Sequence, residues 1–175
     1  MATRFSISQL NQLFADDLGD SYTIQSPLSE KPLLFSAKKH PELIFKAYIY
    51  NCTNPPGGRT LDEYKIQLIL PNQKRGSRGV LDDSDGTVIL IVGFAAYDTT
   101  ENGAWIIWET SRHREFAYSA NLQVKMGSLL DTITKHVFHL QKPGNGEHII
   151  IADRQHLSEA IVLRQKVDID NLLEE

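Results

Sequence analysis

Apolar residues recur along the chain at two different spacings, which predict helices at both ends and strands in the middle. Near the start, Ser6 and Gln9 form a capping-box pattern ahead of an amphipathic repeat, and Gly19 is placed to end that helix. A second repeat predicts a helix over about 127–137. Asp153 is the expected cap of a final helix.

Seven segments between these helices have the short alternating or β-branched pattern of strands. They are 33–35, 43–51, 62–70, 87–92, 104–109, 116–125 and 147–152. The spacing of 87–92 and 104–109 predicts a hairpin or meander. Strands that cluster in the middle and helices that flank them predict an α+β fold, in which a largely antiparallel twisted sheet carries an N-terminal helix and two C-terminal helices.

Composition predicts one domain over residues 1–175. The chain has 175 residues, of which 41% are hydrophobic and 23% charged, enough for a sizeable core. There is no apolar run near the roughly 20 residues that span a bilayer, and the first residues do not resemble a signal peptide, so we expect a cytoplasmic location. The single Cys52 excludes an intramolecular disulfide and a cysteine zinc cluster, and we expect it to be buried.

A formal net charge of −4 is unlike that of a typical nucleic-acid-binding domain, but the charge is unevenly placed. Acidic residues concentrate in a C-terminal tail, about 166–175, which we expect to fray from the rest. Cations cluster in two other segments, as Lys74, Arg75 and Arg78, and then as Arg112 and His113. If these groups converge in the fold, they can bind phosphates.

A glycine turn with an arginine leads into one of the predicted strands. Gly57 and Gly58 let backbone amides approach a phosphate closely, and Arg59 adds a forked cation for the same anion. On the strand that follows, Lys65 and Gln67 share one face, because strand side chains alternate. One face can therefore serve the core while the other meets a polyanion.

The segment 119–125 has a similar division. If it is extended, Ser119, Asn121, Gln123 and Lys125 line one face, and the apolar residues between them line the other. Hydroxyl, amide and ammonium groups are the donors and acceptors that contact phosphates and base edges. An ordinary half-exposed strand has the same pattern. The segment therefore supports DNA binding only in combination with the clusters of cations described above.

Enzymatic and metal-binding interpretations find less support. Glu63 and Lys65 fit the acid and lysine of a PD-(D/E)xK nuclease, but the strand-like segment 43–51 lacks the second acid that such a site needs. His136 and His139 are spaced to share a helix face without an acid or cysteine at ligand spacing. We therefore expect no catalytic residue, no metal and no cofactor in this chain.

Several short runs resemble the DNA sulfur-binding domains of McrA-type type IV restriction endonucleases. The runs are Gly57-Gly58-Arg59, Glu63-Tyr64-Lys65-Ile66-Gln67, Trp108, His113, Tyr118-Ser119 and Asn121-Leu122-Gln123-Val124. The resemblance covers about residues 45–165. It implies a non-catalytic reader of double-stranded DNA that carries a phosphorothioate linkage, within a bacterial restriction system whose nuclease lies in another domain or subunit.

This resemblance implies roles for particular residues. The sulfur pocket would be formed by Tyr118, Ser119 and Ala120, with Pro55 or Pro56 as a wall and Arg59 and His113 as its polar rim. The DNA backbone and base edges would be held by Lys65, Gln67, Lys74, Arg75, Arg78, Arg112, Asn121, Gln123 and Lys125. Three alternatives stay open, namely a modified-base reader, the PD-(D/E)xK-like nuclease and a plain interaction domain. The leading interpretation requires Arg59 and Tyr118 to lie on the same side of the molecule.

Overall fold

A computed structural model of the chain describes residues 4–53, 63–96, 100–141 and 144–174. Its helices are α1 (Ile7–Leu18), the short 3₁₀ helix η1 (Thr110–Arg112), α2 (Met126–Lys135) and α3 (Leu157–Glu174). Its first six strands are β1 (Tyr22–Ile24), β2 (Leu33–Ala37), β3 (His40–Asn51), β4 (Glu63–Leu68), β5 (Gly79–Val80) and β6 (Val88–Ala96). The other five are β7 (Gly103–Trp108), β8 (Glu115–Phe116), β9 (Ala120–Lys125), β10 (Val137–Gln141) and β11 (His148–Asp153).

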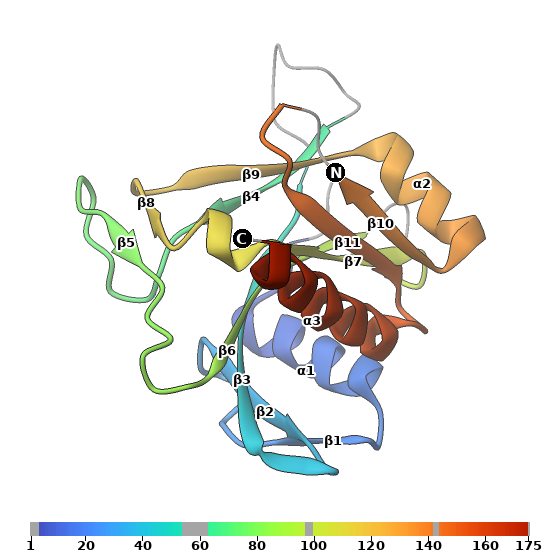
Figure 1. Cartoon of the computed structure of the whole chain (residues 1–175), viewed down its shortest axis with the longest axis horizontal. Helices are drawn as coiled ribbons and strands as arrows, with labels where there is room; N and C mark the ends of the chain where they lie inside the picture. Colours follow the sequence, from blue (N-terminus) through green and yellow to red (C-terminus); the bar gives the residue numbers. More distant parts are fainter. Residues whose placement is uncertain (1–3, 54–62, 97–99, 142–143, 175) are drawn as a thin grey trace.

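Seven strands form the main sheet, in the order β1-β2-β3-β6-β7-β11-β10 (Figure 1). Every neighbouring pair in it is antiparallel except β3 and β6, which are parallel. Two smaller antiparallel pairs, β4–β9 and β5–β8, lie outside this sheet. The predicted α+β class and the predicted β6–β7 hairpin pairing are confirmed.

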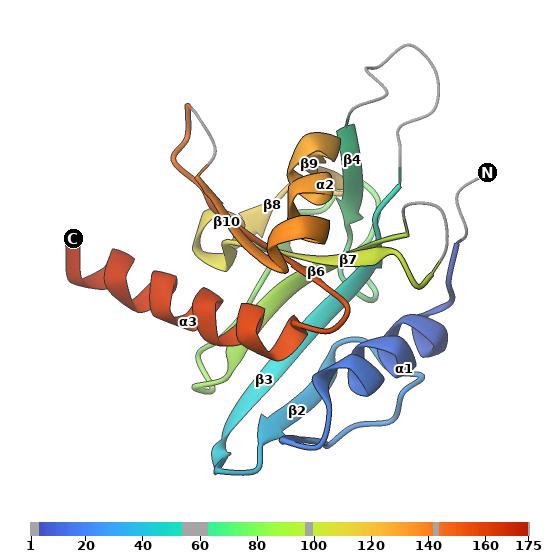
Figure 2. The same ribbon diagram turned by 90° about the vertical axis from the view of Figure 1, so that its right-hand side faces the viewer.

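The main sheet lies between two layers of other elements (Figure 2), and each of its faces packs into a hydrophobic core. On one face α1 and α3 cover the sheet, and Phe14 packs edge-on against Trp105, with both side chains fully buried. On the other face the β4–β9 pair and α2 cover it, where Ile66 and Leu122 pack with Trp108. The sheet is therefore the middle of three layers, and β4–β9 has only one face left for solvent.

Local sequence signals explain several boundaries. The Ser6 hydroxyl accepts a hydrogen bond from the Gln9 amide, and the Gln9 side chain accepts one from the Ser6 amide, which completes the predicted capping box. Gly19 ends α1 with a φ of 76°, a conformation that glycine adopts without strain. Cys52 is buried as expected, and burial raises the pKa of its thiol.

Other predicted boundaries are wrong. The second helix ends at Lys135, because His136 turns into the left-handed region with a φ of 71°, so His139 lies in β10 and not on a helix face with His136. The segment 116–125 is divided into β8 and β9, with Ser119 at a φ of 59° between them. Asp153 ends β11 rather than capping α3 directly.

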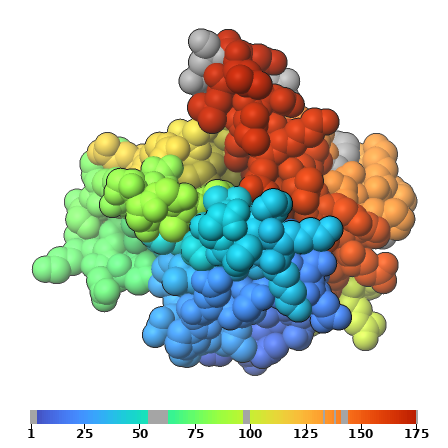
Figure 3. Space-filling model, turned by 60° about the horizontal axis from the view of Figure 1, so that its bottom comes forward, coloured from blue at the N-terminus to red at the C-terminus, as the bar shows by residue number. Residues whose placement is uncertain are grey.

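The C-terminal part of the chain also differs from its prediction. Through Glu174 the acidic segment is the last part of α3 and not a frayed tail. Figure 3 shows this end of the helix standing out from the body of the molecule. No helix within the described ranges is long and apolar enough to cross a bilayer.

Candidate nucleic-acid interface

The outward face of the β4–β9 pair collects polar side chains that the sequence placed on two separate strands. The antiparallel register sets Glu63 opposite Lys125, Lys65 opposite Gln123 and Gln67 opposite Asn121. Cross-strand partners project from the same side of a sheet, so these six side chains share one face, here called the β4–β9 face. The residues between them on both strands are buried against the sheet.

The β4–β9 face confirms the predicted alternation of both strands. It also brings together five of the residues predicted to contact DNA, namely Lys65, Gln67, Asn121, Gln123 and Lys125. One carboxylate, that of Glu63, lies at the end of the face opposite Lys125. The remainder of the face offers amide and ammonium groups, which can bond to phosphate oxygens and base edges.

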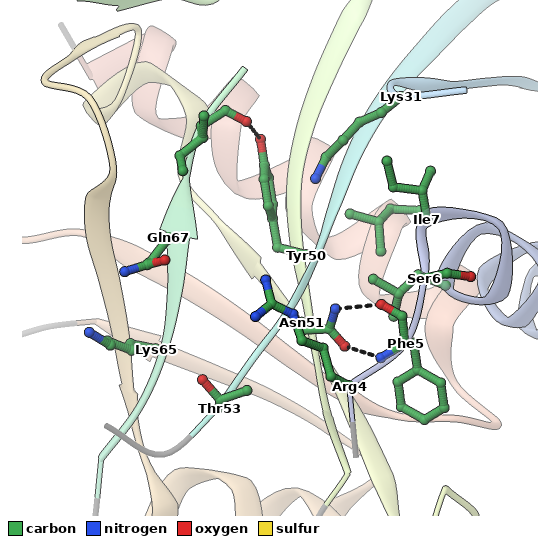
Figure 4. Close-up of a pocket in the computed structure, with 13 residues that line it drawn as sticks. Arg4, Phe5, Ser6, Ile7, Lys31, Tyr50, Asn51, Thr53, Lys65 and Gln67 are labelled. Atoms are coloured by element: carbon green, nitrogen blue, oxygen red, sulfur yellow. Dashed lines mark hydrogen bonds between the residues drawn. The ribbon is translucent and has the colours of Figure 1, made fainter. Parts of the chain in front are cut away.

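A cavity of about 630 Å³ opens beside β4, between this strand, the end of β3 and the segment that leads into α1 (Figure 4). We call it the N-terminal pocket. Its apolar walls are Phe5, Ile7, Leu10, Ile49 and Ile69. Its polar lining is Arg4, Ser6, Lys31, Tyr50, Asn51, Thr53, Lys65 and Gln67, so three cations and no carboxylate line the cavity.

Asn51 fixes the wall of this pocket that carries Arg4. Its side-chain amide donates to the Phe5 carbonyl at 2.8 Å, and its oxygen accepts from the Phe5 amide at 2.8 Å. These two bonds, drawn in Figure 4, act as a short piece of backbone ladder between the N-terminal segment and the end of β3. The capping box at Ser6 fixes the next residue, so the chain that directly follows Arg4 is held in place where it lines the pocket.

Tyr50 and Lys31 form the inner part of the pocket. The Tyr50 hydroxyl donates to the Ile69 carbonyl at 2.9 Å, which ties β3 to the chain after β4. The Lys31 ammonium lies 3.3 Å from the centroid of the Tyr50 ring, a cation–π contact. Burial lowers the pKa of Lys31 to about 7 and raises the pKa of Tyr50, so the phenol stays neutral while the lysine is poised to gain or lose its charge near neutral pH.

The three cations of the pocket have no carboxylate partner within the described ranges. Arg4, Lys31 and Lys65 form no ion pair there. By contrast, the Arg78 guanidinium lies 2.7 Å from the Glu115 carboxylate, and the Lys46 ammonium lies 2.6 Å from the Asp85 carboxylate. The pocket therefore keeps its positive charge available for an external anion.

Sequence reasoning missed Arg4 and Lys31 as parts of a site. Neither residue belongs to a motif, and the two are separated by α1 and β1 along the chain. The only local signal was the capping box after Arg4, which indicates a helix start and not a ligand. Their convergence depends on the docking of the N-terminal segment against Asn51.

Two predicted cations lie in a different polar network. After β7, His113 Nε2 lies 2.6 Å from the Glu147 carboxylate, and an Arg112 amino group donates to the Asn145 carbonyl. Glu109 and Glu147 are themselves almost fully buried, with 4% and 2% of each residue's surface exposed. Arg112 and His113 are thus bound to this network, through the contacts of Arg112 with Glu109 and Asn145 and of His113 with Glu147.

The predicted loop cations lie beyond the end of β4. Lys74 and Arg75 are exposed, without an ion pair among the described residues, in the loop between β4 and β5 (Figure 1). Arg78, in the same loop, is paired with Glu115. Only the first two remain available to extend the β4–β9 face.

The predicted sulfur pocket lies partly outside the described residues. Pro55, Pro56 and Arg59 are the members that lie outside them, and the expected proximity of Arg59 to Tyr118 stays a prediction. Tyr118 and Ser119 are half-buried, and Ala120 packs against the core beneath β9. The apolar hollow with a cationic rim that the structure does show lies on the other side of β4, in the N-terminal pocket.

The two residues that fit a nuclease motif, Glu63 and Lys65, lie opposite a lysine and a glutamine in the structure. Glu63 faces Lys125, and Lys65 faces Gln123. Within the described ranges, Glu63 belongs to no group of three residues that could hold a metal ion. Among the residues that the structure describes, Glu63 and Lys65 are therefore not part of a three-ligand metal cluster.

Comparison with known proteins gives one relationship. Neither the curated proteins nor the solved structures contain a match to this chain. A family model described as methylase-associated X1 matches residues 44–161, which is well over half of the sequence. The matched range includes β4, β9 and the end of β3. The chain therefore belongs to the methylase-associated X1 family.

Proposed function

We propose that this domain binds double-stranded DNA without cutting it and acts as a recognition module in a DNA modification or restriction system. The DNA backbone lies along the β4–β9 face, and a phosphate enters the N-terminal pocket. The observation that carries the proposal is the convergence of Arg4, Lys31 and Lys65, none of them ion-paired within the described ranges, around a cavity with no carboxylate lining. In a chain of net charge −4, such a pocket marks one local surface for an anion.

The family description supports the cellular context of the proposal. A domain that accompanies a methylase has a role beside an enzyme that modifies DNA, and substrate recognition is the simplest such role. Phosphate contacts would position the duplex, while Gln67, Asn121 and Gln123 have the reach and hydrogen-bonding capacity to contact base edges. We assign no catalytic step to this chain.

A preference for phosphorothioate DNA is the finer part of the proposal. Sulfur is larger and less strongly hydrated than oxygen, so it costs less to desolvate against apolar walls such as Phe5, Ile7 and Ile49. Burial of one such atom gives at most about tenfold discrimination, and the cations must supply the rest of the affinity. The N-terminal pocket has both features side by side.

The direct test is the affinity of purified variants for a fluorescent DNA duplex, measured by anisotropy at fixed salt. Lys65→Met should weaken binding roughly tenfold, because it removes a charge-assisted phosphate contact. Lys39→Met is the matched control, since Lys39 is an exposed lysine just before β3, at the end opposite to Asn51. Over eleven residue steps the two ends of β3 are roughly 36 Å apart.

The outcomes separate the levels of the proposal. If Lys65→Met and Lys39→Met lose the same amount of DNA affinity, binding depends on the net charge of the protein and the proposed site is overturned. Equal affinity for sulfur-modified and unmodified duplexes would remove the phosphorothioate preference, while a response to methylated bases would favour a modified-base reader. Magnesium-dependent cleavage of plasmid DNA by the wild type that is lost in Glu63→Ala would contradict the non-catalytic assignment.

A further inference from the structure

We propose that His136, Asp153 and His156 form a binding site for a divalent transition metal of the Zn²⁺ class. The three residues come from the end of α2, the end of β11 and the position just before α3. One donor atom from each lies within 4.8 Å of the others. This site is separate from the β4–β9 face and the N-terminal pocket, and it does not depend on DNA binding.

The Asp153 carboxylate is the centre of the cluster. One of its oxygens lies 2.9 Å from His136 Nδ1, and the other lies 2.6 Å from His156 Nδ1. The two imidazole rings are stacked, with centroids 4.6 Å apart and an angle of 27° between their planes. Both histidines thus present the same type of nitrogen to one carboxylate.

The backbone holds these three residues in place. The His136 carbonyl accepts from the Asp153 amide at 3.0 Å, and the Asp153 carbonyl accepts from the His156 amide at 3.2 Å. His136 has a φ of 71°, which a non-glycine residue adopts rarely and at an energetic cost. Figure 1 shows that the end of α2, the end of β11 and the start of α3 meet at one edge of the molecule.

The donor set fits a metal of this class. Two imidazole nitrogens and one carboxylate oxygen are typical ligands of Zn²⁺, and three protein ligands leave a coordination position open to water. Ligands of a tetrahedral Zn²⁺ at about 2.0–2.1 Å are roughly 3.3 Å apart. The widest donor separation here would have to shorten by about 1.5 Å at most, and the two short contacts between a histidine nitrogen and the Asp153 carboxylate would have to lengthen by about 0.4–0.7 Å.

Partial exposure gives a metal ion access to the site. The exposed fractions of the side chains are 56% for His136, 21% for Asp153 and 26% for His156. The Glu159 carboxylate lies 3.8 Å from His156 Nε2 and adds a second negative charge nearby. The Asp153 side chain is also oriented by the Gln155 amide, which donates to it at 3.1 Å.

The experiment titrates the apo protein with Co²⁺, whose visible absorption reports its coordination, and then displaces Co²⁺ with Zn²⁺. We expect binding of one equivalent with a spectrum typical of imidazole and carboxylate ligands. Affinity should fall at least tenfold in His156→Gln and in His136→Asn. Asparagine is chosen at position 136 because it tolerates the left-handed conformation better than most residues.

Two other histidine positions give matched controls. His139 Nε2 lies 2.8 Å from His148 Nδ1, and His40 Nδ1 lies 3.5 Å from an oxygen of Glu42. His139→Gln and His40→Gln remove the same chemical group elsewhere and should leave Co²⁺ affinity unchanged. If His139→Gln loses as much Co²⁺ affinity as His156→Gln, the metal is not bound specifically by His136, Asp153 and His156, and the assignment is overturned.

A second readout protects the test against misfolded variants. Because Zn²⁺ would bind the folded state, it should raise the Tm of the wild type and not that of Asp153→Asn, provided that circular dichroism shows both to be folded. Absence of Co²⁺ binding and of any Zn²⁺-dependent rise in Tm in the wild type would show that the cluster is only a hydrogen-bonded histidine–carboxylate triad. DNA binding is measured separately, so either proposal can fail alone.

Discussion

At the scale of single residues, Lys31 is the most unusual group in the N-terminal pocket. It combines a half-buried position, a cation–π contact with Tyr50 and a pKa lowered by desolvation to about 7. A phosphate placed beside it would favour the ammonium form and raise that pKa again. If the pocket binds a phosphate as proposed, Lys31 would therefore link anion binding to the uptake of a proton.

This linkage predicts that DNA affinity falls as pH rises above 7. The bound state holds more protons than the free state between the free pKa of about 7 and the higher pKa of the complex, so affinity falls by up to about tenfold per pH unit in that window. Tyr50 stays neutral throughout this window, because burial raises the pKa of its phenol. The measurement is the dissociation constant at pH 7, 8 and 9 at constant ionic strength.

Lys31→Met is the matching variant for the pH series. It should bind more weakly than the wild type at pH 7 and show a clearly smaller change between pH 7 and 9. If the variant and the wild type lose affinity in parallel as the pH rises, Lys31 is not the titrating group.

Tyr50 gives a second prediction at the residue scale. Tyr50→Phe removes the hydrogen bond to the Ile69 carbonyl but keeps the ring beside Lys31, so the free energy of unfolding should fall by about 1 kcal/mol. Denaturant unfolding measures this loss. Under conditions in which both proteins are fully folded, DNA affinity should change little. A large loss of affinity would instead assign the hydroxyl a role in binding.

At the scale of elements, the capping box decides where α1 begins and so where Arg4 lies. Ser6→Ala should lower the free energy of unfolding by about 1 kcal/mol, since it leaves the Gln9 amide without its capping partner. Ser8→Ala, an exposed change inside the same helix, is the control and should be neutral or slightly stabilising. Thermal denaturation of the two variants makes the comparison, and equal Tm values would contradict a role for the cap.

Elements with a clear repeat were predictable, and short ones were not. The alternation of apolar and polar residues in β4 and β9 predicts outward faces for Lys65, Gln67, Asn121 and Gln123, and the structure has them there. By contrast, β10 follows α2 after a single residue, and its apolar positions continue the helical spacing. Only the pairing of β10 with β11 selects the strand, because tertiary hydrogen bonds outweigh local preference.

At the scale of the whole molecule, a net charge of −4 must be overcome by local charge for DNA to bind. We predict a measurable salt dependence that comes from a few phosphate contacts and not from the global charge. Lys65→Met should reduce the slope of log affinity against log salt by about 1, and Lys39→Met should leave it unchanged. A slope near zero for the wild type would favour a plain interaction domain.

The sequence by itself determined the class of the fold, the capped start of α1 and the faces of its alternating strands, because these follow from the local period of apolar residues. It also predicted that five residues of the β4–β9 face point outward from their strands. Only the tertiary structure decided that Arg4 and Lys31 meet Lys65 in one pocket, that Arg112 and His113 turn to buried carboxylates, and that His136 lies beside Asp153 and His156. The physical reason is that such contacts join residues far apart in the chain, and their partners are chosen by the packing of layers on the sheet, which leaves no periodic trace in the sequence.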